Sequence, residues 1–420
     1  MFKGIFSTAT FKQSQITIAG TLINGALGAL FYIVLARFLG PADFGLLIIS
    51  LTTLVLVADI ADIGTNTGLV RFVSSSLAGN SDRAYRFLKL SLEIKLIAWA
   101  ISFLIIFLLA PILATAVFHK DELILPLKLI AFGIGGALLF TFATSSLQAY
   151  QKYFTWSVIN ILTNSLRLLL IVFLGSYLIL DVENSLLIYI FLPFFGFFVA
   201  LFILPARKII QSKNEFHLSK ELFKYNIPVA IFTMIAAFSA RLDIYLNAAL
   251  LSVKEVGIYG AANQLVQIMP QLVSALGLVS APKFASYTNN LQMLTYFKKF
   301  QVLVLGLMFL GILTIPLSIY LIPLLYGSAY SGAVIPFVLL FLGQLVFLFS
   351  IPVHHSIIFY FGRPDVFIWV ALGHLLIIGV LGYLLILSFG ITGAALTVLI
   401  GMVFNFLFPL GWLLLKLRKK

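Results

Sequence analysis

Long apolar runs alternate with short polar segments along the whole 420-residue chain. A helix needs about 20 apolar residues to cross a hydrocarbon core of about 30 Å, and the runs reach that length repeatedly. The pattern predicts twelve transmembrane helices, near residues 14–38, 44–72, 84–110, 124–148, 155–179, 186–205, 224–250, 256–282, 295–321, 332–358, 365–388 and 391–415. We therefore expect an all-α polytopic membrane protein. Its first run should stay as a helix, because it lacks an obvious signal-peptide cleavage site.

The composition agrees with this prediction. The chain is 62% hydrophobic and only 10% charged, whereas soluble domains have about 25% charged residues. It contains no Cys, which excludes disulfides and thiolate metal sites. We attribute the net charge of +13 to basic helix ends on one side of the membrane, and we expect no nucleic-acid partner.

Lys and Arg residues gather on one side of the predicted membrane. That side has Lys3, Lys12, Arg71, Arg83, Arg86, Lys89, Lys152, Arg207, Lys208, Lys213, Lys220, Lys224, Lys283, Lys298, Lys299, Arg363, Lys416, Arg418, Lys419 and Lys420. The loops on the other side have only Arg37, Lys120 and Lys254. Because cytoplasmic loops are enriched in Lys and Arg, we predict a cell-membrane protein with both termini in the cytoplasm. This orientation requires an even number of spans.

One polar segment divides the predicted helices into two sets of six. Its charged and apolar residues suggest a short amphipathic helix on the inner surface, with a solvated loop of no specific role as the alternative. We predict an N-terminal lobe over residues 1–205, a cytoplasmic linker over residues 206–223 and a C-terminal lobe over residues 224–420.

A weak internal repeat supports two related lobes. Adding 212 to the residue number places Asp43-Phe44-Gly45 on Glu255-Val256-Gly257, and Arg71-Phe72 on Lys283-Phe284. Two six-helix lobes enter the membrane in the same sense, so a pseudo-two-fold axis along the membrane normal would relate them, with a cleft between. The alternative is two similar hairpins without a common origin.

Carboxylates are costly inside a membrane helix and mark functional or paired positions. Asp59, Asp62 and Asn66 have i, i+3 and i+7 spacing, so they share one face of the second helix. Lys95 in the third helix lies at a comparable depth, given a rise of 1.5 Å per residue. Two interpretations stay open. Asp59 or Asp62 forms a buried ion pair with Lys95, or the carboxylates line a water-filled cavity and bind a proton or cation.

Amide and cationic side chains lie in three further helices. They are Asn24 in the first, Asn160, Asn164 and Arg167 in the fifth, and Arg241 with Asp243 in the seventh. In a cavity the two arginines would attract a phosphate. Otherwise they pair with Asp243 or with backbone carbonyls.

Catalytic motifs are absent from the sequence. It has no Walker loop, no His-Glu-x-x-His and no Gly-x-Ser-x-Gly element. The short outer loops offer no cluster of acids or histidines at a membrane face. We therefore expect a protein that is not an enzyme and that needs no cofactor or metal ion.

The segment Leu35-Ala36-Arg37-Phe38-Leu39-Gly40-Pro41-Ala42-Asp43-Phe44-Gly45 predicts a turn. Gly40 tolerates unusual backbone angles, Pro41 lacks an N–H, and Asp43 suits the positive end of the next helix. This segment resembles the turn between the first two helices of polysaccharide repeat-unit flippases of the Wzx type, and the stretch from Asp62-Ile63-Gly64 to Arg71-Phe72 is similar to their second helix. Those flippases share a superfamily with the multidrug-and-toxin (MATE) extruders and the lipid II flippases.

The resemblance implies a MATE-like fold and the transport of an isoprenoid-pyrophosphate-linked oligosaccharide from the inner to the outer leaflet. It implies alternating access, driven by an ion gradient, with a cationic cavity for pyrophosphate and sugars. The bilayer and the glycosyltransferases or polymerase of the same pathway would be partners. We predict substrate contacts at Arg241, Arg167, Asn164, Asn24 and Arg37, the last at an outer gate, and ion coupling at Asp59, Asp62 and Asp243.

Two other hypotheses stay open. One is a cation-coupled exporter of small organic molecules with the same fold, with Asp59 or Asp62 as its coupling site. The other is a membrane-embedded enzyme or an assembly partner in a glycan pathway. A positively charged cavity favours the flippase, and a negatively charged one favours the exporter.

Overall fold

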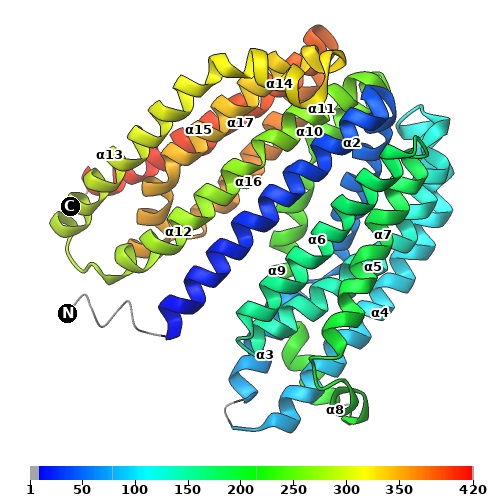
Figure 1. Ribbon diagram of the computed structural model, residues 1–420. Coiled ribbons are helices and arrows are strands. Elements are labelled where there is room, and N and C mark those ends of the chain that lie inside the picture. Colours follow the sequence, from blue (N-terminus) through cyan, green and yellow to red (C-terminus); the bar gives the residue numbers. More distant parts are fainter. Residues whose placement is uncertain (1–8, 78, 214, 419–420) are drawn as a thin grey trace. The chain divides into compact units, whose positions relative to one another are not determined.

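The computed structural model describes residues 9–77, 79–213 and 215–418, and over these ranges the chain forms helices without any β-strand (Figure 1). Ten helices of this part are long and apolar enough to cross a membrane. The first and the last contain a glycine with non-helical backbone angles, Gly40 (φ 74°, ψ 172°) and Gly390 (φ 57°, ψ −139°). Dividing them there gives twelve spans, so the predicted all-α polytopic membrane fold is confirmed.

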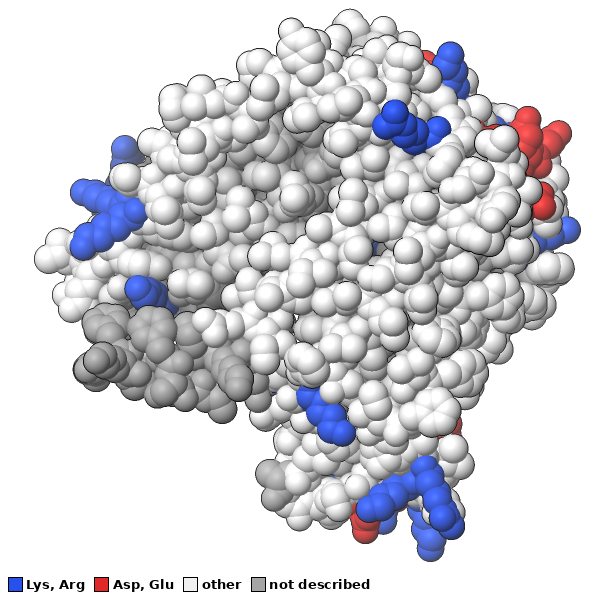
Figure 2. Space-filling view, in the orientation of Figure 1, with Lys and Arg blue, Asp and Glu red and all other residues white. Residues whose placement is uncertain are grey.

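The exposed side chains agree with a membrane environment. Large apolar residues such as Leu108, Leu169 and Phe202 are exposed. Figure 2 shows that most of the drawn surface is uncharged, with Lys, Arg, Asp and Glu in small scattered groups. Lipid tails are as apolar as these side chains, so a membrane solvates this surface without a hydrophobic penalty.

The described chain packs as two units, of which unit 1 lies within Met1–Leu39 and Leu46–Phe238. Its elements are α2 (Ala9–Ala61), α3 (Thr65–Leu77), α4 (Ser81–Ile112), a π-helical turn (Leu113–Val117), a 3-10 turn (Asp121–Leu123), α5 (Ile124–Ala149), α6 (Tyr153–Ser176), α7 (Val182–Leu201), α8 (Ala206–Gln211) and α9 (Phe216–Ser239). Residues 40–45 of α2 and Ser239 of α9 belong to unit 2.

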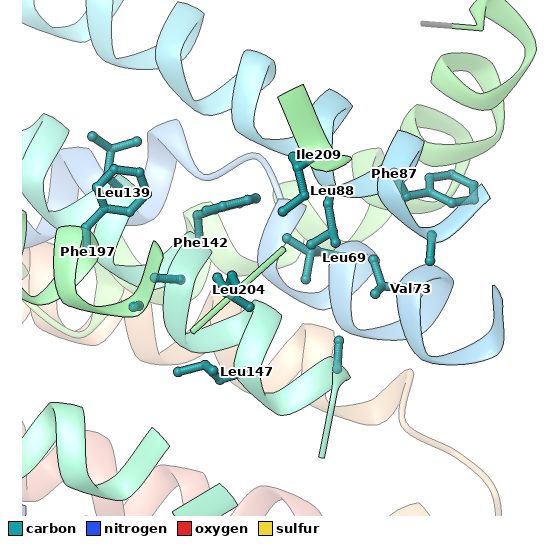
Figure 3. Packing of buried hydrophobic residues seen from close by; sticks show 14 of the residues in the cluster. Leu69, Val73, Phe87, Leu88, Leu139, Phe142, Leu147, Phe197, Leu204 and Ile209 are labelled. Carbon is teal, nitrogen blue, oxygen red and sulfur yellow. The ribbon is translucent and has the colours of Figure 1, made fainter. Parts of the chain in front are cut away.

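A cluster of buried apolar side chains joins the helices at one end of unit 1 (Figure 3). Leu69 of α3, Leu88 of α4 and Ile209 of α8 belong to it. So does Leu222 of α9, which is fully buried. The polar segment is therefore anchored to unit 1, because its apolar residues complete this core.

Residues 206–224 do not form the single amphipathic helix that was predicted for them. Helix α8 ends at Gln211, and α9 already begins at Phe216. The described units divide after Phe238 and not within residues 206–223, because α9 packs into the core of unit 1. The two lobes over residues 1–205 and 224–420 remain a prediction.

Unit 2 lies within Gly40–Gly45 and Ser239–Lys420. Its elements are α10 (Leu242–Leu250), α11 (Val253–Val266), α12 (Ile268–Ser286), α13 (Asn290–Thr314), a 3-10 turn (Ile315–Leu317), α14 (Ser318–Tyr326), a 3-10 turn (Ser328–Ala333), α15 (Val334–His355), a π-helical turn (Ser356–Tyr360), α16 (Val366–Leu376), a π-helical turn (Ile377–Leu381) and α17 (Gly382–Arg418).

Several helices that were predicted as continuous are interrupted in the structure. The helix expected over 44–72 breaks between α2 and α3, the one over 224–250 breaks between α9 and α10, and the one over 256–282 breaks at Gln267. Such breaks are tolerated at membrane depth when the surrounding protein satisfies the freed backbone groups. Apolar periodicity alone does not reveal them.

Two glycines within unit 2 make a reciprocal contact. A Cβ atom on Gly45 would collide with the carbonyl oxygen of Val253, and a Cβ atom on Gly257 would collide with the carbonyl oxygen of Pro41. Residues 253 and 257 are the repeat counterparts of 41 and 45 under the 212-residue shift. The two segments therefore contact each other through equivalent positions, which supports the internal repeat.

Candidate functional site

A cavity of about 250 Å³ lies inside unit 1, between α2, α3, α5, α6 and α7. Its polar lining consists of Asp59, Asp62, Asn66, Thr141, Asn160, Thr163, Asn164, Arg167 and Tyr189. The carboxylates and the arginine come from helices that are far apart in the sequence. The fold thus brings the predicted polar faces of the second and fifth spans to one cavity.

The break between α2 and α3 shapes one wall of this cavity. Ile63 and Gly64 both have left-handed backbone angles, with φ of 49° and 69°. The carboxylate of Asp62 accepts a hydrogen bond from the Thr65 hydroxyl at 2.8 Å and from the backbone N–H of Asn66 at 3.2 Å. Asp62 thereby satisfies free donors at the start of α3 and stabilises its positive end.

Glycine is required at the second position of the break. Gly64 has a positive φ, and a Cβ atom there would lie 2.9 Å from the backbone oxygen of Asn226 in α9. A larger residue would strain the backbone and push α9 away. The close approach of α9 therefore helps to hold the interrupted helix.

Lys95 of α4 forms an ion pair with Asp62. The Lys95 side chain is fully buried, that of Asp62 is 14% exposed, and the Lys95 ammonium also donates to the Thr141 hydroxyl at 3.2 Å. The pairing predicted as one interpretation is thus present for Asp62. The second interpretation is compatible with it, because Asp62 also lines the cavity.

A second polar group includes Asn164 and Arg167 of α6, which line the cavity, and Asn24 of α2, which lies behind them. The side-chain amide of Asn164 donates to the Asn24 oxygen at 2.5 Å, and Arg167 donates through Nη1 to the Asn164 oxygen at 3.0 Å. The Arg167 guanidinium carbon lies 4.1 Å from the ring centre of Tyr189 and 5.5 Å from that of Phe31. Cation–π contacts of this kind hold an arginine in place in a desolvated setting.

Arg167 keeps hydrogen-bonding capacity for a ligand. Its Nε is buried and has no hydrogen-bond partner among the described residues. Buried donors in native proteins are nearly always satisfied, so an unpaired one calls for a partner such as water or a ligand. The sequence predicted Arg167, Asn164 and Asn24 as a polar face, and the structure brings the three into one chain of hydrogen bonds.

Four predicted site residues do not line this cavity. Asn24 reaches it only through its hydrogen bond with Asn164. Arg37 is exposed at the end of the first span. Arg241 lies in the break before α10, and Asp243 is buried in unit 2, where it accepts a hydrogen bond from the Tyr259 hydroxyl at 2.5 Å. Their substrate and coupling roles remain predictions.

Three polar residues of the cavity, Thr141, Thr163 and Tyr189, were missed from the sequence. Thr141 lies in a short run of hydroxyl residues that includes Thr144 and Ser145, which was an available signal. Tyr189 lies in an almost wholly apolar helix, and only its contact with Arg167 reveals its place at the site.

A sequence model of a family described as "Polysaccharide biosynthesis protein" matches residues 11–288. The chain belongs to this family. The match includes every residue that lines the cavity. It confirms the resemblance to polysaccharide flippases predicted from the turn at Gly40-Pro41.

Solved structures place this member of the family in the same fold as known flippases and transporters. "Lipid II flippase MurJ, inward closed conformation" matches with a TM-score of 0.76 at 14% identity, covering 94% of this chain and 87% of the other. An inward-facing multidrug resistance MATE family transporter of the MOP superfamily matches with a TM-score of 0.73 at 14% identity, covering 96% and 98%. No protein with a curated description matches the chain.

Proposed function

We propose that the protein is a flippase that moves an isoprenoid-pyrophosphate-linked oligosaccharide from the inner to the outer leaflet by alternating access. The observation that carries this proposal is the cavity lined by Asn164, Arg167 and Tyr189, in which Asn24 supports Asn164 through a hydrogen bond, in a member of a polysaccharide biosynthesis family. Transport, and not catalysis, is the activity that this family membership supports.

The chemistry of the cavity suits a sugar or a phosphate group. Amide side chains donate to and accept from hydroxyl groups, and the face of an aromatic ring suits the apolar face of a sugar. The Arg167 guanidinium presents donors in a planar fork that matches phosphate oxygens. At about 250 Å³ the cavity is smaller than typical sites for drug-sized ligands, so it would hold one part of the substrate at a time.

Ion coupling is assigned to the carboxylates of the same cavity. Asp62 pairs with Lys95, and both Asp59 and Asp62 line the cavity, so both carboxylates are candidates for exchanging a proton or cation with it. Asp243 is a further candidate, in unit 2. Arg241 would contact the substrate pyrophosphate, and Arg37 would act at the outer gate.

The proposed setting follows from the distribution of charge. The basic loops favour the cell membrane with both termini in the cytoplasm. The glycosyltransferases that build the substrate and the polymerase that consumes it are the expected partners.

Glycan export in cells that lack their own flippase tests the proposal. We expect the wild-type protein to restore surface glycan and Arg167→Gln to abolish it at equal protein level, because the variant loses the phosphate-matching fork. Arg363→Gln is the matched control, since Arg363 is an exposed arginine paired with Asp365. Full surface glycan in Arg167→Gln would rule out the cavity role. Flipping of a fluorescent lipid-linked oligosaccharide in proteoliposomes would separate transport from effects on synthesis.

A cation-coupled exporter of small organic molecules is the second candidate function. The observation that favours it is that two carboxylates and one arginine line the cavity, in a fold shared with multidrug transporters. Resistance of cells to cationic dyes distinguishes the two functions. Dye efflux that depends on Asp59, without any glycan export, would support the exporter and contradict the flippase.

A further inference from the structure

A second hollow lies in unit 1, at the end that the sequence assigns to the cytoplasm. It has a volume of about 460 Å³, and its walls come from α3, the turn before α4, the start of α4 and α9. Arg71, Ser75, Ser76, Asn80, Arg83 and Glu221 supply its polar lining. None of these residues belongs to the cavity that holds Arg167. We call this hollow the arginine pocket.

Three aromatic rings in mutual contact hold both arginines of the pocket. The Phe72 ring stacks on the Phe87 ring at 4.9 Å and meets the Tyr225 ring edge-on at 5.6 Å. The Arg71 guanidinium lies 4.4 Å from the centre of the Tyr225 ring, and the Arg83 guanidinium lies 5.5 Å from that of Phe87. Because these rings fix the two side chains, little side-chain entropy is left to lose when a ligand binds.

The charge of the pocket is not balanced by protein groups. Arg83 pairs with Glu221 at 2.7 Å, and Glu221 is the only carboxylate in the lining. Arg71 contacts the Phe72 and Tyr225 rings, and no acceptor among the described residues takes a hydrogen bond from it. The pocket therefore carries one uncompensated guanidinium with a full set of donors.

We propose that the arginine pocket binds the phosphate group of a membrane lipid at the cytoplasmic leaflet. A guanidinium forms two parallel hydrogen bonds to phosphate oxygens, and these charge-assisted bonds are the strong ones. Arg71 lies six residues before the end of α3 at Leu77, or about 9 Å along the helix axis. That distance from the end of the helix suits contact with a lipid headgroup.

The proposal does not rest on the glycan as substrate. The phosphate could come from an anionic phospholipid of the bilayer or from the pyrophosphate of a lipid carrier, since both present the same group to Arg71. In either case the pocket would hold a lipid at the inner leaflet, outside the cavity that holds Arg167.

Lipid binding by the purified full-length protein tests this inference. The protein is reconstituted in nanodiscs of phosphatidylcholine, and binding of a fluorescent phosphatidylglycerol is titrated. We expect Arg71→Gln to weaken binding about tenfold or more, as the loss of charge-assisted hydrogen bonds predicts. Arg71→Lys keeps the charge but lacks the planar fork, so it should weaken binding by a smaller factor. Arg363→Gln, which removes an exposed arginine outside the pocket, should bind as the wild type does.

Competition with inorganic pyrophosphate tests whether the pocket recognises the phosphate alone or also requires the lipid. Displacement of the lipid by pyrophosphate, seen in the wild type and lost in Arg71→Gln, supports a pocket that recognises the phosphate alone. Lipid binding that depends on Arg71 but resists pyrophosphate supports a pocket that also requires the lipid. Equal lipid binding by wild type and Arg71→Gln overturns the proposal, and so does equal weakening by Arg363→Gln. Because glycan export is not measured, a failure here is distinguishable from a failure of the proposed flippase.

Discussion

The hairpin over residues 36–76 and its repeat counterpart over residues 248–288 share their ends but differ in the middle. Each starts with an acid and a glycine near its outer turn. Each closes with a base followed by Phe, and the base lies over a Tyr ring: Arg71 over Tyr225 at 4.4 Å and Lys283 over Tyr296 at 5.4 Å. These shared features belong to the scaffold.

The middle of each hairpin carries the difference. Asp59 and Asp62 of the first correspond to Gln271 and Ser274 of the second. The first is interrupted at Asp62, whose carboxylate caps α3 and binds Lys95. The second is interrupted at Gln267, which donates to Asn263 at 3.5 Å. At these two positions only the first hairpin has carboxylates. This difference indicates a role specific to the first hairpin and not a general structural one.

Removing the partner of Asp62 should produce the largest effect. Lys95→Met leaves a buried carboxylate without its cation, and we expect a loss of about 3–5 kcal/mol in the free energy of unfolding. Thermal unfolding in detergent measures it. The double variant Asp62→Asn, Lys95→Met removes both charges and keeps a capping side chain, so it should recover most of the loss. An unchanged unfolding temperature in Lys95→Met would mean that the pair does not stabilise the first hairpin.

Substitution of the glycine at the outer turn should destabilise the protein to a similar extent in both halves. Gly45→Ala and Gly257→Ala each introduce a Cβ atom that collides with a backbone oxygen of the other segment, and overpacking of this kind costs about 1–3 kcal/mol. We expect similar decreases in the unfolding temperature for the two variants. Gly306→Ala is the control, since a Cβ atom there meets nothing within 4 Å. A large loss from one glycine variant and none from the other would contradict the reciprocal contact.

Asp59 should affect transport with little effect on stability. The residue lines the cavity, and Asp59→Asn keeps the size of the side chain and an oxygen that accepts hydrogen bonds, so the unfolding free energy should change by only about 1 kcal/mol. Glycan export should nevertheless fall. The equivalent substitution in the second hairpin, Gln271→Ala, should leave export and stability unchanged. If both variants reduced export equally, the difference between the halves would have no functional meaning.

Hydrophobic runs and turn residues were sufficient to predict the spans. Gly40 and Gly390 both have a positive φ, and each lies where one predicted span ends and the next begins. Both could be placed because a short interruption of the apolar run marks each position in the sequence. Depth along two helices also indicated that Asp59 or Asp62 could pair with Lys95, as one of two interpretations, since the rise per residue is fixed.

The interruptions of the helices could not be predicted in the same way. Ile63 has a left-handed φ of 49°, which a β-branched residue rarely adopts, so its identity gave no warning. Arg241 lies in a second break, between α9 and α10. Helix α9 packs against unit 1 through residues such as Leu222, whose neighbours are distant in the sequence. Tyr189 likewise became part of the site only through packing against Arg167.

The contact between Gly45 and Gly257 has a further consequence. Each segment offers the same two positions to the other, as two identical subunits do across a two-fold axis in an isologous dimer. A half-length polypeptide with the first hairpin alone would already contain both surfaces of this contact. The joined chain thus keeps, inside one molecule, an interface of the kind that a symmetric dimer of half-length subunits would use.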